Sequence, residues 1–160
     1  MPSRDQCHKW KLNMKNVLED PNGFKSFQEY LKKHEKDCEK EEGEFTRYTD
    51  FWKECQEYKK INGSDQEQIA VEIFNKYLDY EAKKKIEIED SDNTIKTLRM
   101  KLFNHKEGDP PTDLKIVFDE VEYCMIQYLD RGRGCSKAYK DFCKDLKPDK
   151  KFPRFQCRLM

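Results

Sequence analysis

No stretch of this sequence is apolar over anything near the roughly 20 residues that a membrane-spanning helix requires. The opening residues, MPSRDQCHKW, have no apolar core of the kind found in secretory signal peptides, and neither end has a lipidation pattern. We therefore expect a cytoplasmic protein, whose association with membranes would run through its partners.

The sequence also lacks a net charge, since its 32 basic and 32 acidic residues cancel. No overall field would draw it to nucleic acid, so we expect no nucleic-acid partner. Charged residues make up 40% of the chain, a share that taken alone suggests disorder. Two Trp, ten Phe and eight Tyr argue against disorder, because disordered segments are poor in aromatic residues. We expect one folded domain.

Cys-x-x-Cys pairs and Cys/His clusters with zinc-site spacing are both missing. His8, His34 and His105 are scattered along the chain, so no metal site is predicted. The number of cysteines is odd and no secretory signal precedes them, which favours free thiols in a reducing compartment. The seven cysteines lie at positions 7, 38, 55, 124, 135, 143 and 157.

Sequence patterns typical of catalytic sites are missing as well. There is no phosphate-binding GxxxxGK[ST] or GxGxxG loop, no HExxH metal pair and no GxSxG nucleophile turn. Residues 131–134 (RGRG) are interpreted as a helix-ending turn rather than a nucleic-acid element. Basic neighbours would lower the pKa of the Cys135 thiol, but no histidine lies nearby in sequence to act as its base. We therefore expect a binding domain that is not itself an enzyme and uses no cofactor.

Apolar side chains recur at helical spacing through most of the chain. Phe24, Phe27 and Leu31 fall on one face of a predicted helix, and a later helix is predicted to bury Trp52 with its aromatic neighbours. Residues 83–89 alternate briefly, but one isolated extended segment has no partner with which to form a sheet. Other helices are predicted around the apolar positions 69–78, 95–102, 117–129 and 139–146. The pattern indicates an all-α bundle, in which the helices of Trp52 and Phe74 pack against 117–129.

Turn and capping residues mark the expected ends of these helices. Residues 20–23 (DPNG) and Asn62-Gly63 are predicted turns. Ser64 and Glu67 match a capping box, in which each side chain bonds a free amide of the other's backbone, so a helix should begin there. Ser136 is the predicted cap of the last helix.

The chain divides into three parts on these patterns. We expect an N-terminal extension at 1–9, a helical domain at 10–146 and a C-terminal tail at 147–160. Phe152 and Phe155 are the residues that would dock the tail onto the domain.

Five segments, in this order, resemble the RGS box, the homology domain of regulators of G-protein signalling. Residues 23–32 (GFKSFQEYLK) are similar to its opening helix, and 49–60 (TDFWKECQEYKK) to its most recognisable segment. Residues 70–78 (AVEIFNKYL) resemble the following helix, 82–89 its extended connection, and 118–121 (FDEV) the start of its penultimate long helix. The resemblance implies a compact helical bundle of the RGS type, with about eight or nine helices.

The resemblance also implies a function. Members of this family bind the switch regions of a GTP-loaded G-protein alpha subunit (Gα). They speed hydrolysis by holding those switches in the shape of the transition state, and they donate no arginine because Gα carries its own. A Gα subunit is therefore the implied partner.

Positions that contact Gα in active members are substituted here. The family's acidic pair, and an Asn that touches the catalytic Gln of Gα, correspond to 46–48 (TRY), which places Arg47 and Tyr48 at the contact. A second family Asn falls at Thr97 or Arg99, depending on a two-residue gap. Tyr48 is bulky where the family has a small amide, so we expect it to clash with the switch surface or to miss it.

The family's Asp-Ser-x-Pro-Arg-Phe corner is altered in the same way. It corresponds to 134–139, so its Asp becomes Gly134 and its Arg becomes Ala138. An acidic insertion at 35–44 lengthens the loop before the Phe-Trp helix. These changes favour a domain that binds Gα with weak or absent activation of GTP hydrolysis.

An alternative hypothesis is an interaction scaffold that uses the RGS fold for another signalling protein, as axin-like and sorting-nexin-like members do. The same substitutions support it, because they remove the groups that recognise Gα. The sequence does not set the oligomeric state, and a monomer is favoured.

Overall fold

The structure, a computed structural model, describes residues 2–88, 91–104, 108, 113–132 and 135–147. These residues form eight α-helices and one short 3-10 helix, and no strand, which confirms the predicted all-α bundle. Among them, no helix is both long enough and apolar enough to cross a membrane. The elements are α1 (Arg4–Leu12), α2 (Met14–Glu19), α3 (Pro21–Asp37), α4 (Thr46–Lys59), α5 (Gln66–Tyr77), α6 (Ser91–Phe103), η1 (Leu114–Ile116), α7 (Asp119–Asp130) and α8 (Ser136–Asp145).

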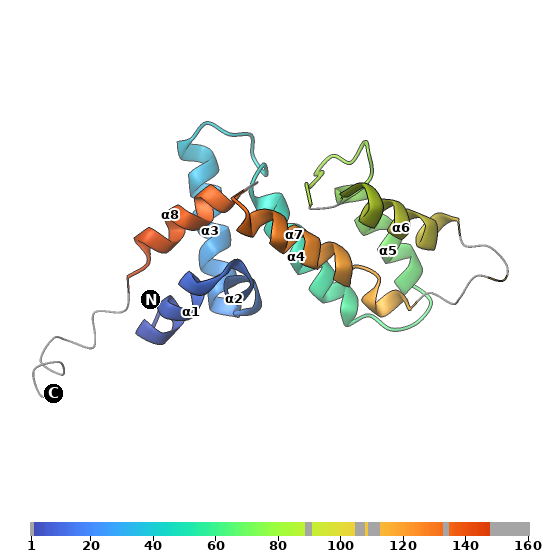
Figure 1. Ribbon diagram of the computed structural model, residues 1–160, viewed down its shortest axis with the longest axis horizontal. Coiled ribbons are helices and arrows are strands. Elements are labelled where there is room, and N and C mark those ends of the chain that lie inside the picture. Colours follow the sequence, from blue (N-terminus) through green and yellow to red (C-terminus); the bar gives the residue numbers. More distant parts are fainter. Residues whose placement is uncertain (1, 89–90, 105–107, 109–112, 133–134, 148–160) are drawn as a thin grey trace, which may run out of the picture.

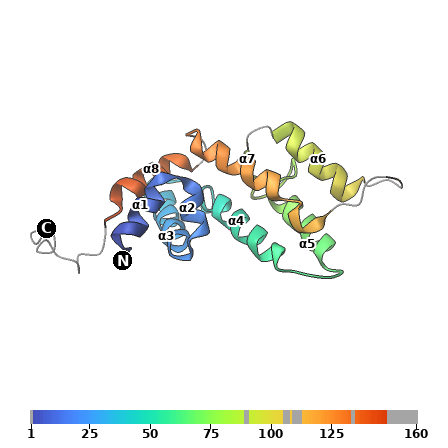
Figure 2. The ribbon, with the colours of Figure 1, turned by 60° about the horizontal axis from the view of Figure 1, so that its bottom comes forward.

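The helices lie in two neighbouring groups, which both views show (Figures 1 and 2). The first group brings the start and end of the domain together, because α8 packs on α1 and α3. The second group contains α4 to α7. Contacts of α3 with α4, and of α2 with α7, join the two groups. The chain therefore leaves the first group at α4 and returns to it at α8.

Aromatic side chains fill the centre of each group. In the first group, the ring of Phe142 on α8 lies 5.2 Å from that of Phe27 on α3. In the second, Phe118 meets the rings of both Phe51 and Tyr58 edge-on, at 6.3 and 5.3 Å. Trp52 is also buried, with 8% of its surface exposed. These contacts confirm that the aromatic residues of α4 are core and that α4 packs against the start of the 117–129 segment.

The turn predicted at 20–23 is shorter in the structure, because α3 already begins at Pro21. Asp20 alone separates α2 from α3, and its carboxylate caps the helix by accepting hydrogen bonds from the amides of Asn22 and Gly23. The same carboxylate accepts the indole N–H of Trp10 at 2.9 Å. Gly23 is helical, and a Cβ on it would lie 2.9 Å from the Trp10 ring. Glycine is thus needed here because the Trp10 ring packs directly on the backbone.

The capping box predicted at Ser64 and Glu67 is wrong. The next helix, α5, begins at Gln66, and its cap residue Asp65 makes no side-chain hydrogen bond. Gly63 has a φ of 102°, and the turn that it starts delays the helix beyond Ser64. A true capping box occurs at the start of α1, where Ser3 and Gln6 bond each other's amides at 2.9 and 3.1 Å.

The cap predicted at Ser136 is wrong as well. Cys135 occupies the cap position of α8, and Ser136 is the first residue inside the helix. Its hydroxyl is buried and has no hydrogen-bond partner. The boundary moved by one residue because the side chains of 135 and 136 both face the core.

Residues predicted to lie outside the domain are partly placed by the structure. Most of the segment 1–9 belongs to α1, whose Cys7 is buried, with 5% exposed. The predicted tail lies outside the described residues beyond Lys147, and with it the docking of Phe152 and Phe155.

The predicted free thiols lead to a measurable order of reactivity. Six of the seven cysteines are described and free, and Cys157 lies outside the described residues. Burial raises the pKa of the Cys135 thiol to about 12 and that of Cys55 well above its usual value. Only a thiolate attacks a disulfide reagent. Among the six described cysteines of the native protein, Cys38, which is exposed, should therefore react first and Cys55 and Cys135 last.

Thiol titration with a disulfide reagent, followed by mass spectrometry, measures this order. Protein unfolded without reductant should show all seven thiols. Pairs that become reactive only after reduction would contradict the prediction of free thiols.

Candidate partner-binding surface

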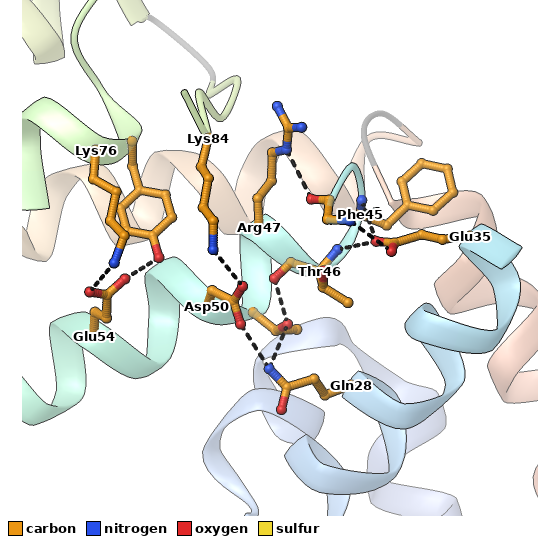
Figure 3. A network of polar contacts seen from close by, with 12 residues as sticks. Gln28, Glu35, Phe45, Thr46, Arg47, Asp50, Glu54, Lys76 and Lys84 are labelled. Atoms are coloured by element: carbon orange, nitrogen blue, oxygen red, sulfur yellow. Dashed lines mark hydrogen bonds and ion pairs between the residues drawn. The ribbon is translucent and has the colours of Figure 1, made fainter. Parts of the chain in front are cut away.

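Two segments that connect helices, far apart in sequence, meet at the first turn of α4. The junction of α7 and α8 lies at the same edge of the molecule (Figure 1). The connections are 38–45 and 82–88; the junction is 131–135, of which 133–134 lie outside the described residues. Lys84 in the second connection forms an ion pair with Asp50 on α4, at 3.6 Å (Figure 3). We call the two connections, residues 46–49 and the described junction residues 131, 132 and 135 the candidate surface.

Tyr48 points into the protein. Only 6% of its surface is exposed, and its hydroxyl accepts a hydrogen bond from the amide of Glu87 at 3.3 Å. Burial raises the pKa of this hydroxyl to about 12, although the bond from Glu87 lowers it. A buried ring is not placed to clash with a docked protein. The expectation that Tyr48 clashes with the switch surface or misses it stays a prediction.

Arg47 is occupied by the protein's own backbone. Its Nε donates to the carbonyl of Gly43 at 3.0 Å, and its Nη1 to the carbonyl of Lys85 at 3.1 Å. The half-buried guanidinium therefore joins the 38–45 connection to the 82–88 connection. The two residues predicted to replace family contact groups both form hydrogen bonds inside the protein.

The two candidates on α6 differ in their surroundings. Thr97 is exposed. The Arg99 guanidinium lies over two rings, 4.4 Å from the centroid of Tyr80 and 5.3 Å from that of Phe74, and 3.5 Å from the carboxylate of Asp79. Arg99 thereby links α6 to the end of α5. Neither Thr97 nor Arg99 has a side-chain amide like that of the family's Asn.

The predicted contact positions at the α7–α8 corner supply no described polar side chain. Gly134 lies outside the described residues, and Ala138 is buried, with 1% exposed. Cys135 is fully buried, and burial raises its pKa. The expectation that basic neighbours would lower this pKa is wrong, because loss of water around the sulfur outweighs them.

Glu35, on α3, bonds to residues of this surface, and sequence reasoning missed it. It is 4% exposed, and its carboxylate accepts hydrogen bonds from the amides of Gly43, Phe45 and Thr46 (Figure 3). A signal did exist in the sequence. Phe27, Leu31 and Glu35 are spaced by four, so Glu35 continues the buried face of α3. Its place at the start of the acidic insertion at 35–44 obscured that signal.

Comparison with known proteins decides the family. The model of the Regulator of G protein signaling (RGS) domain family matches residues 13–156 of this chain. The chain belongs to this family. This confirms the resemblance drawn from the five segments.

Relatives of this RGS domain are moderately similar and longer. It is 34% identical over 83 residues to human Regulator of G-protein signaling 10, covering 51% of this chain and 40% of that protein. It is 30% identical over 98 residues to Regulator of G-protein signaling rgs-7 of Caenorhabditis elegans, covering 60% of this chain and 11% of that protein. It is 29% identical over 102 residues to mouse Regulator of G-protein signaling 5, covering 62% of this chain and 49% of that protein. The chain thus spans less than half the length of each of these relatives.

A second polar cluster of this RGS domain lies away from the candidate surface, in a groove of about 580 Å³ lined by α2, α4 and α7. Lys59 Nζ lies 2.7 Å from Glu122 and 3.1 Å from Asp119, and Gln56 donates to Glu122 at 2.9 Å. Burial raises the pKa of Glu122 despite the nearby lysine. Burial lowers the pKa of Lys59, but the two carboxylates outweigh it and the pKa is raised. The cluster contains two ion pairs, both made by Lys59, that link α4 to α7.

Proposed function

We propose that this RGS domain binds a Gα subunit through the candidate surface and activates GTP hydrolysis weakly or not at all. Family membership and relatives that are named regulators of G-protein signalling support the choice of partner. The domain is a regulator and carries out no covalent chemistry of its own.

One observation supports the proposal that GTP hydrolysis is activated only weakly. Arg47 and Tyr48 stand where active members place groups that contact the switches, and both are bonded inward to the 82–88 connection. Family catalysis depends on groups that bind the transition state more tightly than the ground state. Each missing partner of a buried polar group costs about 1–3 kcal/mol, and about 1.4 kcal/mol is tenfold in rate. The substitutions at 48, 134 and 138 therefore remove most of a typical acceleration even where docking survives.

The test is single-turnover GTP hydrolysis by a panel of Gα subunits with the domain in excess. We expect less than about tenfold acceleration on every member, since three missing contacts weaken transition-state binding. Acceleration beyond tenfold on any member would mean that these positions do not limit activity.

Tyr48→Asn restores the family's residue but should not restore activity. The change removes a buried ring and the acceptor for the Glu87 amide, so the 82–88 connection loses one of its bonds to α4. Tyr48→Phe is the matched control, because it keeps the ring and removes the hydroxyl alone. If the Asn variant activates GTP hydrolysis and the Phe variant does not, the side-chain amide at position 48 is the only group that the surface lacks.

The scaffold hypothesis is separated from this proposal by binding. A Gα-directed domain should bind the form loaded with GDP and aluminium fluoride, a transition-state analogue, more tightly than the GDP form. No binding to any nucleotide form of any panel member would favour a different partner.

A further inference from the structure

We infer that Glu35 is the positioning residue of the candidate surface: its buried carboxylate sets the conformation of the 38–45 connection, and thereby the affinity for the partner. The part that concerns affinity rests on the proposed function. The part that concerns conformation rests on the structure of the free protein alone.

Both oxygens of the Glu35 carboxylate accept hydrogen bonds. Oε1 accepts the amides of Phe45 and Thr46, each at 2.7 Å, and Oε2 accepts that of Gly43 at 3.0 Å (Figure 3). Hydrogen bonds to an ionised acceptor are about twice as strong as neutral ones. Three such bonds converge on a side chain that is 4% exposed. The carboxylate therefore holds the connection at two of its last three residues, Gly43 and Phe45, and holds α4 at its first residue, Thr46.

Glu35 also replaces the missing cap of α4. Phe45 occupies the cap position of that helix and makes no side-chain hydrogen bond. The first amides of a helix are unpaired and carry partial positive charge, which stabilises an anion placed beside them. A carboxylate from α3 takes that place, and this explains why its charge is buried although no ion pair of Glu35 occurs in the described part of the chain.

A chain of bonds carries this effect across the surface. Glu35 holds the amide of Gly43, the carbonyl of Gly43 accepts Arg47 Nε, and Arg47 Nη1 donates to the carbonyl of Lys85. Release of Gly43 would thus loosen Arg47 and, through it, the 82–88 connection. One carboxylate thus holds the 38–45 connection directly and supports one of the ties of the 82–88 connection indirectly.

Glu35→Gln tests this with little change in shape. The amide oxygen can still accept from Phe45 and Thr46, but the NH₂ group then faces the amide of Gly43, which loses its acceptor. Hydrogen exchange at the Gly43 amide, followed by NMR on the free protein, should speed up about tenfold or more. Exchange at Phe27 and Leu31, in the buried part of α3, should not change. The matched control is Glu29→Gln, which removes the same charge from an exposed position of the same helix.

Affinity is measured with Gα subunits loaded with GDP and aluminium fluoride. Glu35→Gln should weaken binding about tenfold, since the connection must be ordered again on docking, and Glu29→Gln should leave it unchanged.

Three results would overturn the inference. Unchanged exchange at Gly43 would show that the carboxylate does not hold the connection. Equal acceleration at Gly43, Phe27 and Leu31 would show a general loss of stability. Faster exchange at Gly43 with wild-type affinity would show that the connection is not part of the binding surface. Failure of the wild-type chain to bind any panel member would instead reject the proposed function, and exchange at Gly43 would still decide whether Glu35 orders the connection.

Discussion

Trp52→Ala is expected to lower the free energy of unfolding by about 3–5 kcal/mol, the usual cost of emptying a large aromatic site in a core. Trp52 is 8% exposed, and its indole N–H donates to the carbonyl of Leu18 on α2 at 3.2 Å. The residue therefore joins the two groups of helices, and alanine would leave both a cavity and an unpaired carbonyl. A loss of this size is a large part of a typical domain's stability of about 5–15 kcal/mol.

Urea denaturation followed by circular dichroism measures the change in midpoint. Tyr123→Ala is the matched control, because Tyr123 lies on the rim of the same groove with 63% of its surface exposed. Its effect should stay within about 0.5 kcal/mol. Similar urea midpoints for the two variants would mean that Trp52 does not stabilise the contact between the two groups of helices.

Lys59→Met should lower the free energy of unfolding by about 2–3 kcal/mol. The variant leaves the Glu122 carboxylate, 7% exposed, without its cation. Removing one partner of a buried pair costs about 3–5 kcal/mol, and we expect less because Lys59 itself is 33% exposed. Lys60→Met is the control, since Lys60 is exposed and next in the chain.

The pH dependence of this loss has a definite sign. The pKa of Glu122 is already raised by burial above 4.5, and without Lys59 it should rise further. The folded variant then holds a proton more tightly than the unfolded chain, so its stability increases as the pH falls through the raised pKa towards 4.5. The deficit relative to the wild type should shrink over that interval. A deficit that grows as the pH falls would contradict this account.

A double variant separates the buried charge from lost packing. Lys59→Met with Glu122→Leu removes both charges, and replacing a buried pair by apolar groups is often neutral or stabilising. We expect it to be more stable than Lys59→Met alone. If the two variants are equally unstable, the loss comes from packing of the lysine stem.

Helix positions were predictable where side chains repeat along one face. Phe51, Trp52 and Tyr58 share a face of α4, and all three are buried. Helix starts were less predictable. The capping pattern at Ser64 is local, but the helix begins at Gln66 because the turn at Gly63 and the packing of α5 outweigh one cap, which contributes about 1 kcal/mol.

By itself, the sequence predicted an all-α RGS domain, which the structure and the family comparison confirm, and it predicted which family positions are substituted. Helical periodicity and motif order are properties of neighbouring residues, so they can be read without a structure. Only the tertiary structure decided what the substituted residues do. Tyr48 bonds Glu87, which is 39 positions away, and Arg47 bonds Lys85, 38 positions away. The direction of a side chain depends on which distant segment packs over it, and for that reason Tyr48 and Arg47 became internal ties and Glu35 became the support of the candidate surface.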